Sequence, residues 1–199
     1  MMLIEQTTVP GVALPVQVMK DHLRLGTGFS DDGMQDVLIE SYLRAAIGVI
    51  EGRIGKALLA RRFRWTLEGW RGAKGLALPV APVSEVVSVT LFDMGGVGAV
   101  VDPARVRLMP DMHRPRLTGV GGSLPVVPTE GRVEVVFDAG FGTTWDAVPA
   151  DLGQAVILLA AEYYEQRHMA GAREGGLPFG VQALIERWRT VRVLGGGAA

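Results

Sequence analysis

The spacing of apolar residues changes twice along this chain, and no other feature of the sequence limits its fold as strongly. Over residues 1–60, apolar side chains recur every three or four positions, which is the period of an amphipathic helix. Within residues 61–145 this helical period is absent, and the segment 62–68 alternates apolar and polar residues, which is the period of a half-buried strand. The helical period returns over residues 146–190. Helices, then strands, then helices predict an α+β fold, in which a small antiparallel β region is inserted between the N- and C-terminal parts of one helical core.

Two helices are expected in the N-terminal part of the core. The first covers residues 15–25, where Pro15 suits a first helical turn. The second covers residues 30–55, where Ser30 is a suitable N-cap and Gly55 a suitable stop. We expect one broad face of this second helix to be buried, formed by Met34, Val37, Leu38, Tyr42, Ala45, Ala46, Val49, Ile50 and Ile54.

The C-terminal part of the core is expected to hold a long helix over residues 150–169 and a short one over residues 178–188. Pro149 stands at the entry to the long helix, again where proline is favoured. The two long helices of the chain should pack along their apolar stripes. That packing would bury together Leu38, Ala46, Ile50, Ala155, Leu159 and Tyr163.

Strands are expected over residues 62–68, 85–92 and 132–138, and a further strand within residues 100–109 is interrupted by Pro103. Glycines within residues 95–101 indicate a hairpin turn.

The stretch 110–131 holds four prolines and no apolar period, so it is expected to be one long loop. Long loops inside compact domains are usually functional, so we expect it to contact a neighbouring subunit or another protein. Residues 191–199 follow the last helix as an extended tail.

A search for catalytic patterns is negative. The chain has no cysteine, and its three histidines, His22, His113 and His168, stand far apart. The sequence GRIGKA at 52–57 lacks the spacing and the hydroxyl of a phosphate-binding loop. The sequence GGSLP at 121–125 lacks the second glycine and the preceding strand of a nucleophile elbow. No catalytic residue and no cofactor is therefore expected.

Three carboxylates, Asp31, Asp32 and Asp36, gather at the start of the second helix. A metal site and a helix cap would both use them, and capping with dipole stabilisation is the simpler interpretation. We therefore expect no metal.

Charge and hydropathy limit the possible partners. The 20 basic and 21 acidic residues give a net charge of −1, so the surface as a whole is not built to hold nucleic acid. The longest apolar run, residues 155–161, is much shorter than the roughly 20 residues of a membrane span. The N-terminal residues lack the pattern of a signal peptide. Because 48% of the residues are hydrophobic, we expect copies of the chain to cover part of one another's surface.

Several segments together resemble a known family. They are VMKDHLRL, DDGMQDVLIESYLRAAIGVIEGRIGKAL, LALPVAPVSEVVSVTLFD, VEVVFDAGFG and VPADLGQAVILLAAEYYEQR. Their order and spacing over residues 15–167 resemble the head–tail connector (adaptor) family of long-tailed bacteriophages, which also occurs in phage-derived gene transfer agents. The family often has a tyrosine before the aspartate of the second strand, where this chain has Phe92 before Asp93.

The resemblance implies a structural virion protein and not an enzyme. Its members form a homo-oligomeric ring, usually twelve-fold, below the portal of the capsid. The ring extends the DNA channel, through which DNA passes without sequence-specific binding, and docks the next neck protein, the stopper. The implied location is the neck of the virion, after assembly in the bacterial cytoplasm. A small soluble enzyme and a cellular interaction module, each with an unrecognised site, stay open as alternatives.

The segment RWRTVRVLGGGAA, residues 187–199, is the candidate binding site for the portal. Val191 and Val193 alternate with Arg192, which suits an extended strand added to the edge of a partner's sheet. With Leu194 they are too few apolar residues to order this segment alone. Trp188 and Arg189 are residue types that often anchor interfaces. The alternative is that the tail packs on its own subunit or on an adjacent one.

Overall fold

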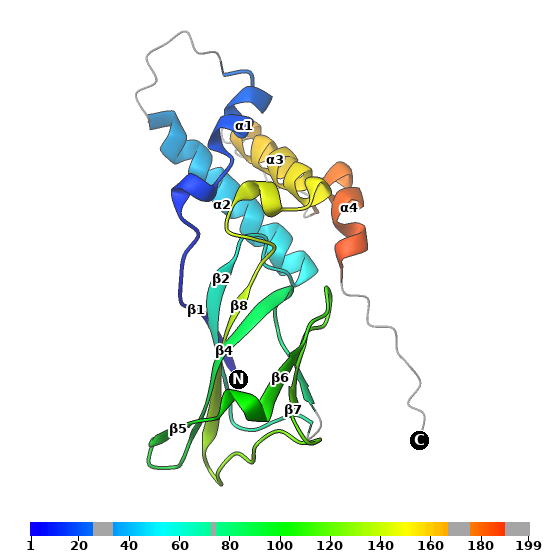
Figure 1. Ribbon diagram of the computed structural model, residues 1–199. Helices are drawn as coiled ribbons and strands as arrows, with labels where there is room; N and C mark the ends of the chain where they lie inside the picture. The colour runs from blue at the N-terminus through cyan, green and yellow to red at the C-terminus, as the bar shows by residue number, and fades with distance from the viewer. Residues whose placement is uncertain (26–33, 73–74, 167–175, 190–199) are drawn as a thin grey trace.

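The computed structural model describes residues 1–25, 34–72, 75–166 and 176–189. The α-helices gather at one end of the molecule and the strands at the other (Figure 1). Segments from both ends of the chain build the helical part, and the middle of the chain builds most of the β part. The predicted α+β fold is confirmed.

The described residues form four α-helices: α1 (Val16–His22), α2 (Met34–Ile54), α3 (Ala150–Glu165) and α4 (Phe179–Ile185). All four lie within segments predicted to be helical. Gly55 follows α2 with a φ of 67°, the left-handed conformation of a helix stop. The predicted cap residues Ser30, Asp31 and Asp32 lie outside the described residues, as does His168. Short 3-10 turns also occur: Gly11–Ala13, Pro103–Arg105, Trp145–Ala147 and Glu186–Trp188.

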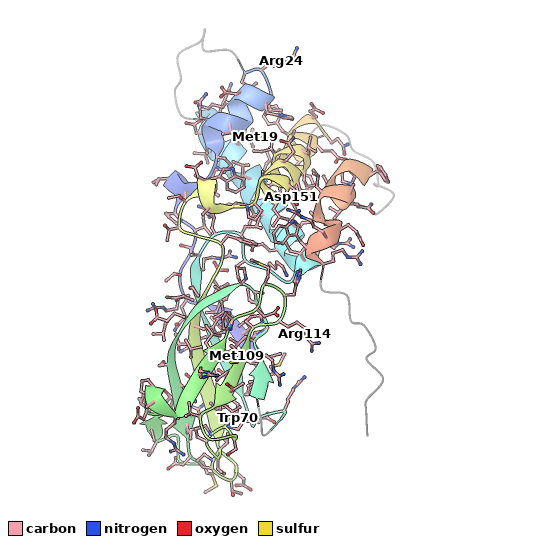
Figure 2. All side chains as sticks on the ribbon, turned by 45° about the vertical axis from the view of Figure 1, so that its right-hand side comes forward. Met19, Arg24, Trp70, Met109, Arg114 and Asp151 are labelled. Atoms are coloured by element: carbon pink, nitrogen blue, oxygen red, sulfur yellow. The ribbon has the colours of Figure 1, made fainter. Side chains whose placement is uncertain are left out.

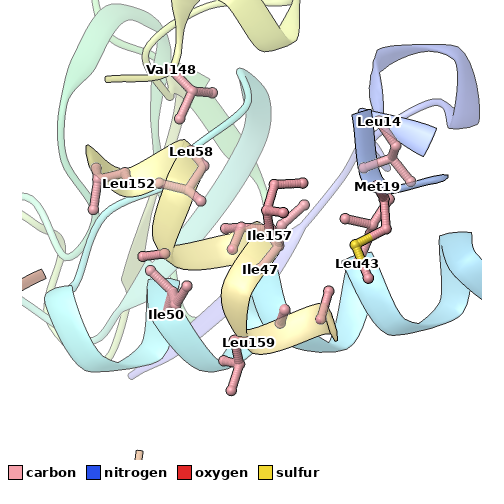
Figure 3. Close-up of a cluster of buried hydrophobic side chains, with 14 of the residues drawn as sticks. Leu14, Met19, Leu43, Ile47, Ile50, Leu58, Val148, Leu152, Ile157 and Leu159 are labelled. Carbon is pink, nitrogen blue, oxygen red and sulfur yellow. The ribbon is translucent and has the colours of Figure 1, made fainter. Parts of the chain in front are cut away.

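Helices α2 and α3 pack against each other in the centre of the helical core, and α1 and α4 cover further sides of this pair. The labelled side chains of Figure 3 that belong to α2 point towards α3 and the N-terminal segment. Ala46, Ile50, Ala155 and Leu159 are buried as predicted, whereas Tyr163 is only half-buried.

The predicted buried face of α2 was wrong in part. Leu38 is 40% exposed and Val37 is 72% exposed, whereas Ile39, Leu43 and Ile47 are buried in their place. The cause is that α2 is apolar on two opposite sides, so helical spacing alone fits more than one stripe. The neighbouring helices decide which stripe is covered.

The larger sheet has the strand order β1-β2-β8-β4-β5 and is antiparallel throughout. The strands are β1 (Met2–Glu5), β2 (Arg61–Leu67), β4 (Val83–Phe92), β5 (Gly98–Val100) and β8 (Arg132–Ala139). The alternation predicted for β2 is confirmed, since Phe63, Trp65 and Leu67 are buried, and β8, predicted as a strand, buries every second residue in the same way. Strand β1 was not predicted: it pairs with β2 at the edge of the sheet, inside a segment expected to hold only helices.

The smaller sheet has the order β3-β7-β6, formed by β3 (Gly75–Ala77), β6 (Val106–Met109) and β7 (Arg116–Gly119). Strand β7 corrects the expected loop over residues 110–131. Leu117 on β7 is fully buried and lies opposite Leu76 and Leu108. The strand is too short for an alternation to be visible, and it pairs with the distant β3 as well as with the nearby β6.

The hairpin turn predicted within residues 95–101 joins β4 to β5. Asp93 caps it: its Oδ1 accepts a hydrogen bond from the amide of Val97 at 2.8 Å. Gly96 has a φ of 81°, which an amino acid with a side chain rarely adopts.

The helical and β parts meet where the chain enters β2 and leaves β8. The amide of Ala60 donates to the carbonyl of Gly142 at 2.7 Å. Gly140 has a φ of 136°, and a Cβ there would lie 2.5 Å from the backbone of Ala60. The two crossings of the chain are therefore held side by side by direct backbone contact.

Candidate functional site

The root of the C-terminal tail is fixed to the helical core by Trp188. The 3-10 turn Glu186–Trp188 follows α4 directly. The indole ring of Trp188 meets the ring of Phe141 edge-on, with centroids 5.5 Å apart and an interplanar angle of 86°. Its Nε1 donates to Oδ2 of Asp151 at 2.7 Å.

The carboxylate of Asp151, at the start of α3 where α3 and α4 meet, interacts with three donors (Figure 2). Besides Trp188, the Nε of Arg187 lies 2.7 Å from Oδ2, and the amide of Leu152 donates to Oδ1 at 3.0 Å. Burial alone would raise the pKa of this carboxyl, but the hydrogen bonds from Trp188, Leu152 and Arg187 outweigh it and hold the pKa below its usual value. The carboxylate therefore stays ionised and holds the last described turn of the chain.

Only part of the predicted portal-binding segment lies in the described residues. Trp188 is half-buried against its own chain, and Arg189 is exposed and pairs with Glu186 at 3.0 Å. Val191, Arg192, Val193 and Leu194 lie outside the described residues.

Phe141 and Asp151, which hold Trp188, were not identified from the sequence. An acidic residue in the first turn of a helix is usually explained by the helix dipole, so Asp151 carries no sign of a partner 37 positions away.

A second cluster joins the end of α2 to residues 111–114. Lys56 is 1% exposed, and its Nζ lies 3.1 Å from Nδ1 of His113. Burial lowers the pKa of Lys56, while the nearby carboxylate of Asp111 acts in the opposite direction. Oδ1 of Asp111 in turn accepts hydrogen bonds from the amides of His113 and Arg114, both at 2.7 Å. These contacts fasten the segment before β7 to the junction of the two parts of the molecule.

A groove of about 290 Å³ lies between β4, β5 and the smaller sheet. It is lined largely by valine, leucine and serine, and Glu85 is the ionisable residue among its described lining. An acid–base pair with a nucleophile is therefore not present in this lining.

Among the described residues, no group of three histidine, cysteine, aspartate or glutamate side chains is placed to hold a metal ion. Asp36, one of the three clustered carboxylates, forms an ion pair with Lys20. None of the described helices is long and apolar enough to cross a membrane.

Comparison with solved structures identifies close relatives over nearly the whole chain. A chain from the neck of an empty gene transfer agent particle, computed with C6 symmetry, is 59% identical with a TM-score of 0.89. A chain from the neck of a native particle, computed with C12 symmetry, is 54% identical with a TM-score of 0.84. Each match covers 98% of this chain and 99% of the other chain.

A third chain, from the virion of a native gene transfer agent particle, is 59% identical with a TM-score of 0.86, again over 98% of this chain and 99% of that chain. No protein-family model matches the chain, and a search of curated proteins also finds no match.

This agreement over the full length defines a structural protein of phage-like particles rather than an enzyme. The chain belongs to the head–tail connector (adaptor) family found in the necks of gene transfer agents.

Proposed function

We propose that this protein is the head–tail connector of a gene transfer agent or phage particle and forms a homo-oligomeric ring below the portal. The observation that carries the proposal is the 59% identity to a chain of a gene transfer agent neck over nearly the full length of both chains.

We propose that the ring holds twelve copies of the chain, because the neck that contains one relative was computed with C12 symmetry. The ring extends the DNA channel and docks the next neck protein. A net charge of −1 suits a channel along which DNA slides, because a strongly basic wall would hold the phosphates. The chain assembles into the virion neck in the bacterial cytoplasm.

The tail is proposed to fasten the ring to the portal. Trp188 supports this role as a fixed root: its indole is bonded to Asp151 and packed on Phe141, so the chain leaves each copy at a defined point. Beyond it, Val191, Arg192, Val193 and Leu194 offer an apolar alternation for a strand added to a portal sheet. Arg189, the last described residue, is exposed beside this point and pairs with Glu186 of its own chain.

The test of this function is a deletion of residues 190–199, which leaves Trp188 and its contacts in place. The truncated chain is expected to fold with an unchanged thermal midpoint but to be lost from purified DNA-filled heads. The matched control is a deletion of residues 195–199 alone, which carry no large apolar side chain.

Complete tailed particles containing the truncated chain would contradict portal binding by the tail. Absence of the full-length chain from the neck, observed by electron microscopy of particles made with a tagged chain, would contradict the connector function itself.

A further inference from the structure

Helix α2 has an uncharged face that nothing in the described chain covers. The face points away from the helical core and runs from residue 37 to residue 52, about 24 Å at 1.5 Å per residue. Val37 is 72%, Leu38 40% and Val49 36% exposed. The face consists of Val37, Leu38, Ser41, Ala45, Gly48, Val49 and Gly52.

Beside this face lie four charged residues of α2 that form ion pairs, Asp36, Glu40, Arg44 and Glu51, while Arg53 is exposed near the end of the helix. Glu40 binds Arg44 at 2.6 Å, and Glu51 binds Arg61 at 2.6 Å. Asp36 pairs with Lys20 on α1. A helix that faced only water would carry such residues on its outward side, so the outward side of α2 has the composition of a covered surface.

The two glycines of this face have no explanation within the chain. A Cβ added to Gly48 or Gly52 would meet no atom within 4 Å, and neither glycine has a positive φ. Glycine in a helix is less stable than alanine, so these positions weaken α2 without any packing benefit inside one copy. By contrast, a Cβ on Gly11 would lie 3.1 Å from a carboxylate oxygen of Glu40, which gives that glycine an intrachain reason.

We propose that this outward face of α2 is a surface through which one copy of the chain contacts the next copy in the ring. The inference rests on the proposed ring. A ring of identical subunits uses head-to-tail contacts, so each copy presents two different surfaces to its neighbours. Small residues at positions 41, 45, 48 and 52 allow another copy's backbone to approach α2 closely, and the flanking Val37, Leu38 and Val49 supply the apolar area.

Other occupants fit this face less well. DNA requires lysine or arginine towards its phosphates, and the face has none. A wall of the DNA channel would be wetted, and three exposed aliphatic side chains on one helix are costly there.

Photo-cross-linking in assembled particles tests the contact directly. The probe is p-benzoylphenylalanine in place of Ala45, in the full-length chain, with the control probe in place of Gln154, which is exposed on α3. The proposal predicts a product at twice the mass of the chain that contains only peptides of this chain, and predicts no such product from position 154.

A product of position 45 with DNA or with a different neck protein, or no product, would overturn the proposal. These results require that the chain is present in the particles. If the unsubstituted chain is absent from them, the connector function fails instead, so the two failures are distinguishable.

A glycine replacement gives a second test with two opposite readouts. Gly48→Ala is expected to raise the thermal midpoint of the free chain, because alanine favours the helix and its Cβ meets open space. In competition with the wild-type chain, the variant is expected to enter particles at least threefold less often than its share of the supply.

The matched control is Gly180→Ala on α4, an exposed helical glycine whose Cβ also meets no atom within 4 Å. It should enter particles in proportion to its supply. If the contact tolerates the single methyl group of alanine, the larger side chain of Gly48→Leu should still reduce incorporation. Unchanged incorporation of both Gly48 variants would overturn the proposal.

Discussion

Helices α2 and α3 are both apolar on more than one side, but they differ in how that apolar surface is covered. On α3 the exposed residues are Ala150, Gln154 and Glu165, because α1, α2 and α4 lie against its other sides. On α2 one apolar side faces α3 and the opposite side faces outward. An apolar pattern therefore indicates that a helix face will be covered, but the pattern does not identify whether the same chain or another copy covers it.

The largest effect is expected from the face of α3 that its own chain covers. Leu159 is 1% exposed, and Leu159→Ala should lower the free energy of unfolding by about 2–5 kcal/mol. Urea denaturation of the free chain measures this loss. A change below about 1 kcal/mol would show that the centre of the helical core tolerates a cavity, and would remove the contrast between the two helices.

A smaller loss is expected where the end of α4 is fastened to the start of α3. Trp188→Phe keeps an aromatic ring against Phe141 but removes the donor to Asp151. Because Asp151 keeps its contacts with Arg187 and Leu152, the expected loss of unfolding free energy is about 1–2 kcal/mol. Denaturation of both chains under the same conditions checks the value. An unchanged stability would mean that the contact between the two aromatic side chains alone holds the turn.

The same contact should depend on pH. The folded-state pKa of Asp151 lies below that of an unfolded aspartate, so the ionised carboxylate stabilises the fold at pH values above about 4. This stabilisation is lost as the pH falls through the lower folded-state pKa. The stability difference between the wild type and Asp151→Asn should therefore hold from pH 7 to pH 5 and shrink near pH 3. A difference that stays constant or grows towards pH 3 would contradict the assignment.

The smallest effect is expected on the outward face of α2. Leu38→Ala, at a position that is 40% exposed, should change the unfolding free energy of the free chain by about 1 kcal/mol or less. The comparison with Leu159→Ala uses the same substitution on the other helix, so it isolates coverage from chemistry. A loss as large as that of Leu159→Ala would mean that the free chain already buries this face.

The strands with the clearest alternation could be predicted from the sequence, because a strand with one buried face has an apolar residue at every second position. Phe63, Trp65 and Leu67 on β2 are examples. Strands β1 and β7 were not predicted, since each has only four residues and each pairs with a strand distant in the chain, β2 for β1 and β3 for β7. The predicted buried face of α2 was right at Ala46 and Ile50 but included Val37 and Leu38, which are exposed, because the outward face of the helix is apolar as well.

Of the candidate site, the sequence indicated only that Trp188 and Arg189 are residue types suited to an interface. That Trp188 packs on its own chain depends on Phe141 and Asp151, which the fold brings to it from before α3 and from the first turn of α3. No local pattern records such a contact, because its two sides are 37 and 47 positions from Trp188.

The pairing of β2 with β8 has a consequence for the order in which the chain folds. Helix α2 ends at Ile54 and α3 begins at Ala150, so their docking closes a loop of 95 residues, 55–149, in an unfolded chain. Once Arg61 lies opposite Ala139, only residues 55–60 and 140–149 remain as free connections. The entropic cost of closing the loop then falls by about 1.5 kcal/mol. We therefore expect the sheet to form first and the helical core to close over its ends, so that substitutions that weaken β8 slow the docking of α2 and α3, which lie outside the sheet.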